Sequence, residues 1–210
     1  MISRLYLSTL LAIAAVLWGV LLILNGVTVS VAFLKPLSMV LGALVLILGL
    51  FDKWAWHLPF LHPWFVSIPD LRGTWKGKII SSWIDPKTGD KISPIDAYFV
   101  IRQTFSSIQL RLITTQSSSE LLTGNIVRDT DGIYVVLGIY VNTPKLSYRD
   151  VSPIHHGGLL LHIQGNPPHT LSGQYWTDRD TKGELHFAER SNKLYYDFEE
   201  AEKGNYKKSS

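Results

Sequence analysis

Hydrophobic residues are distributed in two different ways along this chain. Near the amino end they form two continuous runs, residues 5–24 and 36–51, whereas after residue 70 they alternate with polar residues. The first run has 20 residues and no charge, and at about 1.5 Å per helical residue it matches the roughly 30 Å hydrocarbon core of a bilayer. The pattern predicts membrane-spanning helices followed by an all-β domain.

The second apolar run is shorter, with 16 residues. Residues 31–34 or the interfacial side chains of Trp54 and Trp56 can supply its missing turn. We therefore expect helices at about residues 5–24 and 33–51. Because residues 25–30 leave room only for a tight reversal, the two helices form a transmembrane hairpin over residues 1–52.

The fixed positive charges predict the orientation of this hairpin. Arg4 and the amino terminus precede the first helix and Lys53 follows the second, while Lys35 alone lies near the far side. The positive-inside tendency therefore favours amino and carboxyl termini in the cytoplasm and a multi-pass protein of the inner membrane. A cleaved signal peptide ending near Asn25 and a soluble core hairpin are the alternatives, but a second apolar run follows the first and neither run has a polar stripe.

Aromatic residues are concentrated in residues 53–69, which hold three tryptophans and two phenylalanines. Such rings suit the membrane–water interface, and Pro59, Pro63 and Pro69 forbid a continuous helix. We interpret this stretch as an interfacial linker. His57 and His62 are expected to be ordinary surface histidines.

From residue 71 onward the alternation has a period of two and the segments are rich in β-branched and aromatic residues, which predicts strands. Turn sequences ending in Gly89, Gly132 and Gly183 join several of them as hairpins. Eight strands are expected, at residues 71–84, 95–103, 107–116, 121–128, 132–142, 158–164, 170–179 and 184–190.

Eight consecutive antiparallel strands form either a sandwich or a barrel, and a barrel is favoured because closure removes the exposed edges. We expect a lipocalin-like, minimal up-and-down β-barrel over residues 70–190, in the cytosol, able to hold one small ligand. The irregular segment 143–156 is either a lid over one mouth or a plain loop. Residues 191–210 are expected to be a tail, frayed from Asp197 onward.

Charge and composition exclude several classes of function. From residue 70 onward there are 17 lysines and arginines and 16 aspartates and glutamates, so long nucleic acid is an improbable partner. The chain contains no cysteine, which excludes disulfides and thiol chemistry. The apolar runs hold no Asp, Glu, Arg or His, which disfavours a transporter.

Two motifs carry a family resemblance. Residues 69–77 read Pro-Asp-Leu-Arg-Gly-Thr-Trp-Lys-Gly, and residues 172–179 read Ser-Gly-Gln-Tyr-Trp-Thr-Asp-Arg. With the hairpin, they resemble the two-transmembrane, β-strand-rich effectors of bacterial CD-NTase (SMODS) antiphage operons, known as CBASS. The resemblance covers the whole chain. It implies a barrel that senses a cyclic dinucleotide, oligomerisation of the hairpins, and inner-membrane disruption that kills the infected cell before phage spread.

A cyclic dinucleotide offers flat bases and two phosphodiesters, so its site needs aromatic faces and guanidinium groups. Tyr175, Thr177 and Arg179 alternate onto one face of a strand and are the first candidates. Trp75 either belongs to the site or plugs the barrel floor, in which case Arg179 would cap it. The predicted ligand-binding residues are Tyr98, Arg102, Arg111, Tyr140, Tyr148, Tyr175, Thr177 and Arg179.

Catalysis is not expected. Asp178 and Asp180 flank a hairpin, where aspartate serves turn geometry, and His155 and His156 lack a third ligand at metal spacing. No nucleophile elbow, phosphate loop or dinucleotide fingerprint occurs. The predicted protein is not an enzyme and has no metal or cofactor besides its activating ligand. The alternative function is a membrane-tethered, lipocalin-like carrier or sensor of a small apolar ligand.

Overall fold

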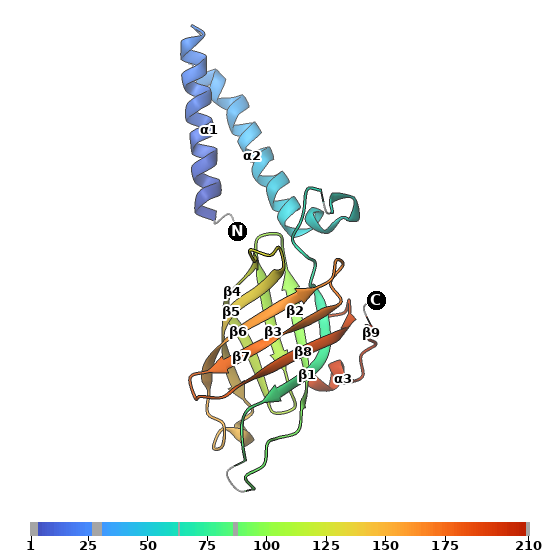
Figure 1. Cartoon of the computed structure of the whole chain (residues 1–210). Coiled ribbons are helices and arrows are strands. Elements are labelled where there is room, and N and C mark those ends of the chain that lie inside the picture. The colour runs from blue at the N-terminus through green and yellow to red at the C-terminus, as the bar shows by residue number, and fades with distance from the viewer. Residues whose placement is uncertain (1–3, 27–30, 63, 86–87, 209–210) are drawn as a thin grey trace. The chain divides into compact units, whose positions relative to one another are not determined.

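The computed structural model describes residues 4–26, 31–62, 64–85 and 88–208. It divides into two compact units, the first comprising residues 1–66 with 104–106 and the second comprising residues 67–103 and 107–210. Figure 1 labels the elements of both units.

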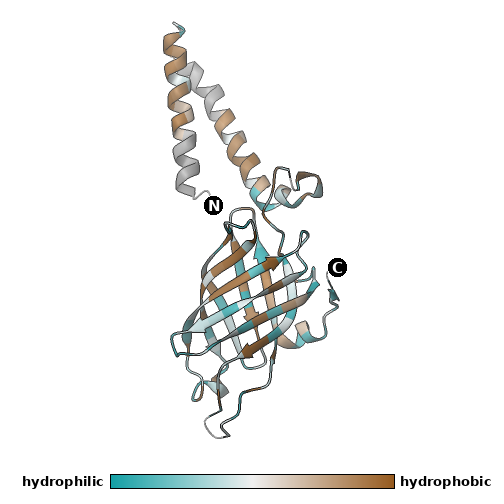
Figure 2. Cartoon of the chain, in the orientation of Figure 1, coloured by the Kyte–Doolittle hydropathy of each residue, from teal (hydrophilic) through white to brown (hydrophobic). Residues whose placement is uncertain are grey.

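The first unit contains the two helices that the apolar runs predict. Helix α1 (Arg4–Leu24) and helix α2 (Val31–Lys53) match the expected ranges closely. Of the reversal predicted at residues 25–30, residues 27–30 lie outside the described residues. Where their side chains are described, both helices present mostly exposed apolar groups (Figure 2). In the part of the chain that the structure describes, no helix has the length and hydropathy expected of a membrane span.

The segment after α2 folds into two short 3-10 helices, η1 (Ala55–His57) and η2 (Pro59–Leu61). Trp56 is fully buried, and a ring nitrogen of His62 lies 3.1 Å from the Trp56 carbonyl oxygen. Phe51 packs edge-on against Phe65 and Phe105, with ring centroids 5.8 and 5.1 Å away. Residues 53–66 are therefore folded against the end of α2, and His62 contributes to that packing.

The second unit is a closed, antiparallel, up-and-down β-barrel, which confirms the predicted fold. Each strand pairs with the next along the chain, and β1 pairs with β8 to close the cylinder (Figure 1). The barrel strands are β1 (Gly73–Ser81), β2 (Ile95–Gln103), β3 (Ile108–Ile113), β4 (Ser117–Arg128), β5 (Tyr134–Pro144), β6 (His155–Gln164), β7 (Thr170–Thr177) and β8 (Lys182–Ser191).

Strands β4 and β6 begin earlier than their hydrophobic alternation predicted. Residues Ser117–Ser119 pair with residues 142–144, and His155 pairs with Asn142. The inward side chains of this region are polar, so hydrophobic periodicity does not mark it. The predicted irregular segment 143–156 is accordingly shorter, and contains a 3-10 helix η3 (Leu146–Tyr148).

Two of the three predicted hairpin glycines adopt a left-handed backbone. Gly89 and Gly132 have φ of 75° and 89°, but in the third hairpin Asp180, with φ of 60°, takes that conformation in place of Gly183. Aspartate tolerates this region better than most residues. Gly183 already lies in β8 opposite Tyr175, and a Cβ there would collide with the Tyr175 ring. Residues 86–87 of the first turn lie outside the described residues.

One end of the barrel is filled by a tight hydrophobic core. Trp75 is fully buried and its Nε1 donates a hydrogen bond to the Leu71 carbonyl oxygen at 2.9 Å, while Phe99 and Phe187 stack with centroids 4.2 Å apart. The predicted plug role of Trp75 is thus confirmed. Its cap is Arg190, not Arg179, with the guanidinium carbon 5.2 Å from the Trp75 ring centroid.

The carboxyl-terminal tail is folded, which corrects the expectation of a frayed end. Helix α3 (Phe198–Glu202) is capped by Asp197, whose side chain accepts a hydrogen bond from the Glu200 N–H, and β9 (Lys207–Lys208) pairs with β8. Phe198 and Tyr206 both pack on Tyr98, with centroids 5.3 and 5.8 Å away. The tail has a docking surface because Tyr98 points out of the barrel wall.

Candidate functional site

The barrel encloses a cavity of about 710 Å³. Its lining comes from the end of the barrel where β1, β3, β5 and β7 finish and β2, β4, β6 and β8 begin, together with the loops at that end. Since the opposite end is filled around Trp75, the cavity has its opening at one end only. Its volume is within the range of small-molecule sites.

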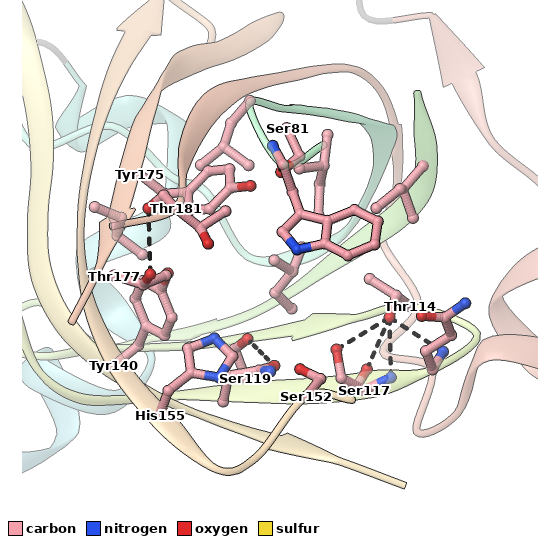
Figure 3. A pocket seen from close by; sticks show the side chains of 18 of the residues that line it. Ser81, Thr114, Ser117, Ser119, Tyr140, Ser152, His155, Tyr175, Thr177 and Thr181 are labelled. Atoms are coloured by element: carbon pink, nitrogen blue, oxygen red, sulfur yellow. Dashed lines mark hydrogen bonds between the residues drawn. The ribbon is translucent and has the colours of Figure 1, made fainter. Parts of the chain in front are cut away.

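The cavity is apolar at depth and polar toward its mouth. Phe99, Leu110, Leu159 and Leu185 belong both to the buried core and to the lining. Polar side chains from β1, β4, β5, β6 and β7 and from the loops at this end line the rest of the cavity, and Figure 3 shows several of them. These polar lining residues are Ser81, Ser93, Thr114, Gln116, Ser117, Ser119, Asn142, Ser152, His155, Thr177 and Thr181.

Arg179 is the one lysine or arginine among the described residues of this lining. Its guanidinium donates a hydrogen bond from Nη2 to the Ser152 hydroxyl at 3.3 Å, and its backbone N–H donates to the Thr177 Oγ1 at 3.3 Å. No aspartate or glutamate of the described chain lines the cavity. A ligand in this cavity therefore meets one exposed positive charge and many neutral hydrogen-bonding groups, an arrangement suited to an anionic, polar molecule.

Five of the eight predicted site residues line the cavity. Tyr175, Thr177 and Arg179 lie together on β7 and the turn after it, as their alternation predicted, and Figure 3 shows Tyr175 and Thr177 on one side of the cavity. Tyr140 joins them from β5, and Tyr148 from the loop between β5 and β6. Tyr148, Val151 and Ser152 of that loop line the mouth of the cavity.

Tyr140 is buried and Tyr175 is partly buried inside the barrel. Burial raises the pKa of the Tyr140 hydroxyl well above its ordinary value, and the neighbouring Tyr175 raises it further. Burial also raises the pKa of Tyr175. Both side chains are neutral at physiological pH, and the Tyr140 hydroxyl donates to the Trp176 carbonyl oxygen at 3.5 Å.

Three predicted residues lie outside the cavity, which corrects their placement. Phe99 and Ile101 face inward on β2, so Tyr98 before them and Arg102 after them face outward. Tyr98 is covered by the tail, and Arg102 lies over the exposed Tyr196 ring with its guanidinium carbon 5.6 Å from the centroid. Arg111 faces outward on β3 and forms a salt bridge with Glu120 on the neighbouring strand β4.

The sequence analysis missed several polar lining residues. Ser119, Asn142 and His155 are 8 to 9% exposed and lie inside the barrel wall. Burial lowers the pKa of His155, and the charge of Arg179 lowers it as well. In the sequence, these residues are marked only by polar side chains at alternate positions beyond the end of the hydrophobic alternation. The same pattern also fits an exposed strand end.

Asp178, Asp180 and His156 near the turn behave as structural groups. Asp178 accepts a hydrogen bond from the His156 backbone N–H at 3.1 Å, and Asp180 holds the left-handed turn position. Among the described residues, no group of three histidine, aspartate or glutamate side chains is arranged to hold a metal ion.

Comparison with known families identifies the barrel unit. The family model described as the Cap15 cyclic dinucleotide receptor domain matches residues 66–189, a span that includes all eight barrel strands except the last residues of β8. No curated protein matches the chain.

Proposed function

Because the chain belongs to the Cap15 cyclic dinucleotide receptor family, we propose that the cavity at the open end of its barrel is where the cyclic dinucleotide binds. The observation that carries this proposal is the single-ended cavity of about 710 Å³ inside the matched residues. It combines five aromatic side chains with one guanidinium and a wall of hydroxyl groups; the aromatic residues are Trp83, Phe99, Tyr140, Tyr148 and Tyr175.

The chemistry of the lining suits such a ligand. Aromatic faces stack on bases, and Arg179 at the mouth is available to a phosphodiester. The second phosphodiester would be held by neutral donors such as serine and threonine hydroxyls, which make weaker contacts than a guanidinium. We therefore expect affinity to depend on salt, but less strongly than for a receptor with several arginines in its site.

We further propose that ligand binding activates a membrane effector of a CBASS antiphage system. In this proposal α1 and α2 form an inner-membrane hairpin with both termini in the cytoplasm, the ligand drives oligomerisation, and the gathered hairpins disrupt the membrane. The support is the uncharged run at residues 5–24 and the exposed apolar side chains of both helices, such as Leu17, Leu21 and Leu46, at 57 to 69% exposure. Such surfaces are unfavourable in water and favourable in a bilayer.

Activation requires the ligand to favour the assembled state over the resting state. The full 210-residue chain would be reconstituted into vesicles of phosphatidylethanolamine and phosphatidylglycerol that contain a self-quenched dye. Addition of the cyclic dinucleotide that binds should release the dye and produce cross-linkable oligomers, whereas vesicles without ligand should stay sealed. Tight binding without dye release would contradict the membrane proposal and leave the receptor assignment intact.

The apolar floor of the cavity favours a second candidate, a membrane-tethered carrier or sensor of a small apolar ligand. Phe99, Leu110 and Leu159 would contact such a molecule. Mass spectrometry of material extracted from the purified chain separates the two functions. A stoichiometric lipid, together with no binding of any cyclic dinucleotide, would support the carrier.

A further inference from the structure

A row of three polar side chains crosses the inner wall of the barrel on neighbouring strands. Ser119 of β4 pairs directly with Asn142 of β5, which pairs directly with His155 of β6. All three line the cavity and each is more than nine-tenths buried. Figure 3 shows Ser119 and His155 side by side on one wall of the cavity, with Tyr175 and Thr181 across from them.

The hydrogen bonds of the row leave the amide hydrogens of Asn142 and one ring nitrogen of His155 available. The Ser119 hydroxyl donates to Asn142 Oδ1 at 2.9 Å, so the Asn142 amide keeps its two N–H groups. His155 Nδ1 lies 2.9 Å from the Pro153 carbonyl oxygen. Because a carbonyl oxygen only accepts, Nδ1 carries the ring hydrogen and Nε2 presents a lone pair.

Neither free group has another partner within the described chain. No hydrogen bond joins Asn142 Nδ2 or His155 Nε2 to another described residue, and neither atom is sealed from the cavity. Burying such groups without partners costs free energy. Because both atoms are accessible from the cavity, a ligand that displaces water from them must supply an acceptor for Asn142 and a donor for His155.

The row does not suit a phosphate. Burial disfavours the charged form of His155, and the nearby Arg179 disfavours it further. A neutral imidazole would direct a lone pair at a phosphate oxygen, which is repulsive. The Arg179 guanidinium and the serine and threonine hydroxyls of this lining suit an anion better.

We propose that Asn142 and His155 bind the hydrogen-bonding edge of a nucleobase; this rests on the proposed binding of a cyclic dinucleotide in the cavity. The amide N–H of Asn142 and the lone pair of His155 Nε2 supply a donor and an acceptor on neighbouring strands. Adenine offers the complement through N1 and the N6 amino group, guanine through O6 and N1–H, and uracil through O4 and N3–H. Unsubstituted purine lacks the N6 amino group of adenine and therefore offers only the N1 acceptor.

The test measures binding of defined probes to the full chain by titration calorimetry. The probes are cyclic di-AMP, cyclic di-GMP, cyclic di-UMP, cyclic GMP-AMP and a cyclic dinucleotide with unsubstituted purine in place of adenine. The variants are His155→Leu, which removes the acceptor, and Asn142→Asp, which keeps the oxygen that Ser119 contacts and removes the N–H donors. His162→Leu is the matched control, because His162 lies on the same strand and is exposed on the outer face.

We expect each site variant to lower the affinity for the preferred probe by about tenfold or more. That is the effect of losing one hydrogen bond and leaving a buried group unpaired. His162→Leu should leave affinity unchanged. If an adenine probe is preferred, the purine probe should bind the native chain more weakly and should be insensitive to His155→Leu. The comparison of the adenine and purine probes on the native chain does not depend on the folding of any variant.

Two failures are distinguishable. If the native chain binds a cyclic dinucleotide but His155→Leu and Asn142→Asp, folded as judged by circular dichroism, keep its affinity and base preference, the base-binding role is wrong and the receptor function stands. If the native chain binds none of the probes, the proposed function itself fails.

Discussion

Arg190 and Trp75 form the cap of the barrel floor, with the guanidinium carbon 5.2 Å from the centroid of the buried indole ring. Arg190 Nε also donates a hydrogen bond to the Arg72 carbonyl oxygen at 3.0 Å, and its Nη2 lies 3.5 Å from Asp70. The arginine therefore closes the first strand onto the last through three kinds of contact. This relationship is the structural counterpart of the motif at residues 69–77.

Replacing Arg190 with leucine should lower the free energy of unfolding by about 2 to 3 kcal/mol, because a largely buried guanidinium loses its hydrogen bonds and leaves Asp70 less well paired. Urea unfolding followed by tryptophan fluorescence measures this. Arg102→Ala is the control, since Arg102 is exposed and contacts only an exposed ring, and it should change stability by no more than about 0.5 kcal/mol. Equal effects of the two substitutions would contradict the capping role.

Asp70 should make the barrel sensitive to acid. Burial alone would raise its pKa, but hydrogen bonds from Arg72 and the charges of Arg72 and Arg190 outweigh burial and hold the pKa below the ordinary value of 3.8. As pH falls, the unfolded chain therefore binds the proton first. The stabilisation is complete above about pH 4 and is lost as pH falls through the folded pKa.

The measurement is the urea midpoint at pH 7 and at pH 3 for the native chain and for Asp70→Asn. The substitution should cost about 1 to 2 kcal/mol at pH 7, and the difference between the two proteins should shrink at pH 3. A constant difference across this range would show that the Asp70 charge contributes nothing to stability.

Arg179 should matter for binding and not for folding. Because its side chain is exposed and bonds only to Ser152 and the turn, Arg179→Ala should leave the melting temperature within about 2 °C. The substitution should lower the affinity for the cyclic dinucleotide by about tenfold and reduce the dependence of that affinity on salt. Arg111→Ala, on the outer wall, is the matched control, and a similar loss with that variant would place the ligand elsewhere.

The tail should contribute to the stability of the barrel. Phe198→Ala removes a ring that packs at 5.3 Å from Tyr98, and it should cost about 1 to 2 kcal/mol because the ring is only partly buried. Tyr196→Ala, at a position that is 66% exposed, should cost much less. Thermal unfolding followed by circular dichroism compares the two, and no difference would mean that α3 is not docked in solution.

Much of the barrel could be predicted from sequence because strand formation is local. Alternation with a period of two marks each strand, and glycines such as Gly89 and Gly132 mark its turns, so the number and order of strands and most boundaries followed from neighbouring residues. The predictions were wrong where that local signal weakens. Strands β4 and β6 extend through polar residues that face a cavity, and Asp180 took a backbone conformation expected of Gly183.

The site could be predicted only in part for the same physical reason. Tyr175, Thr177 and Arg179 share a face by alternation, which one strand determines alone. Whether that face points inward depends on how every other strand pairs, and a shift of one residue moves all side chains to the opposite face. Tyr98, Arg102 and Arg111 were chosen for chemistry without that information, and the barrel places them outside.

By itself, the sequence determined that apolar helices precede an antiparallel, up-and-down β domain, because these features depend on spacing and composition along the chain. The tertiary structure alone decided which arginine covers Trp75 and which polar residues form the row Ser119–Asn142–His155. The physical reason is that these contacts join residues separated by 13 to more than 100 positions, and only the closure of β1 onto β8 and the register of the strands between them bring such residues together.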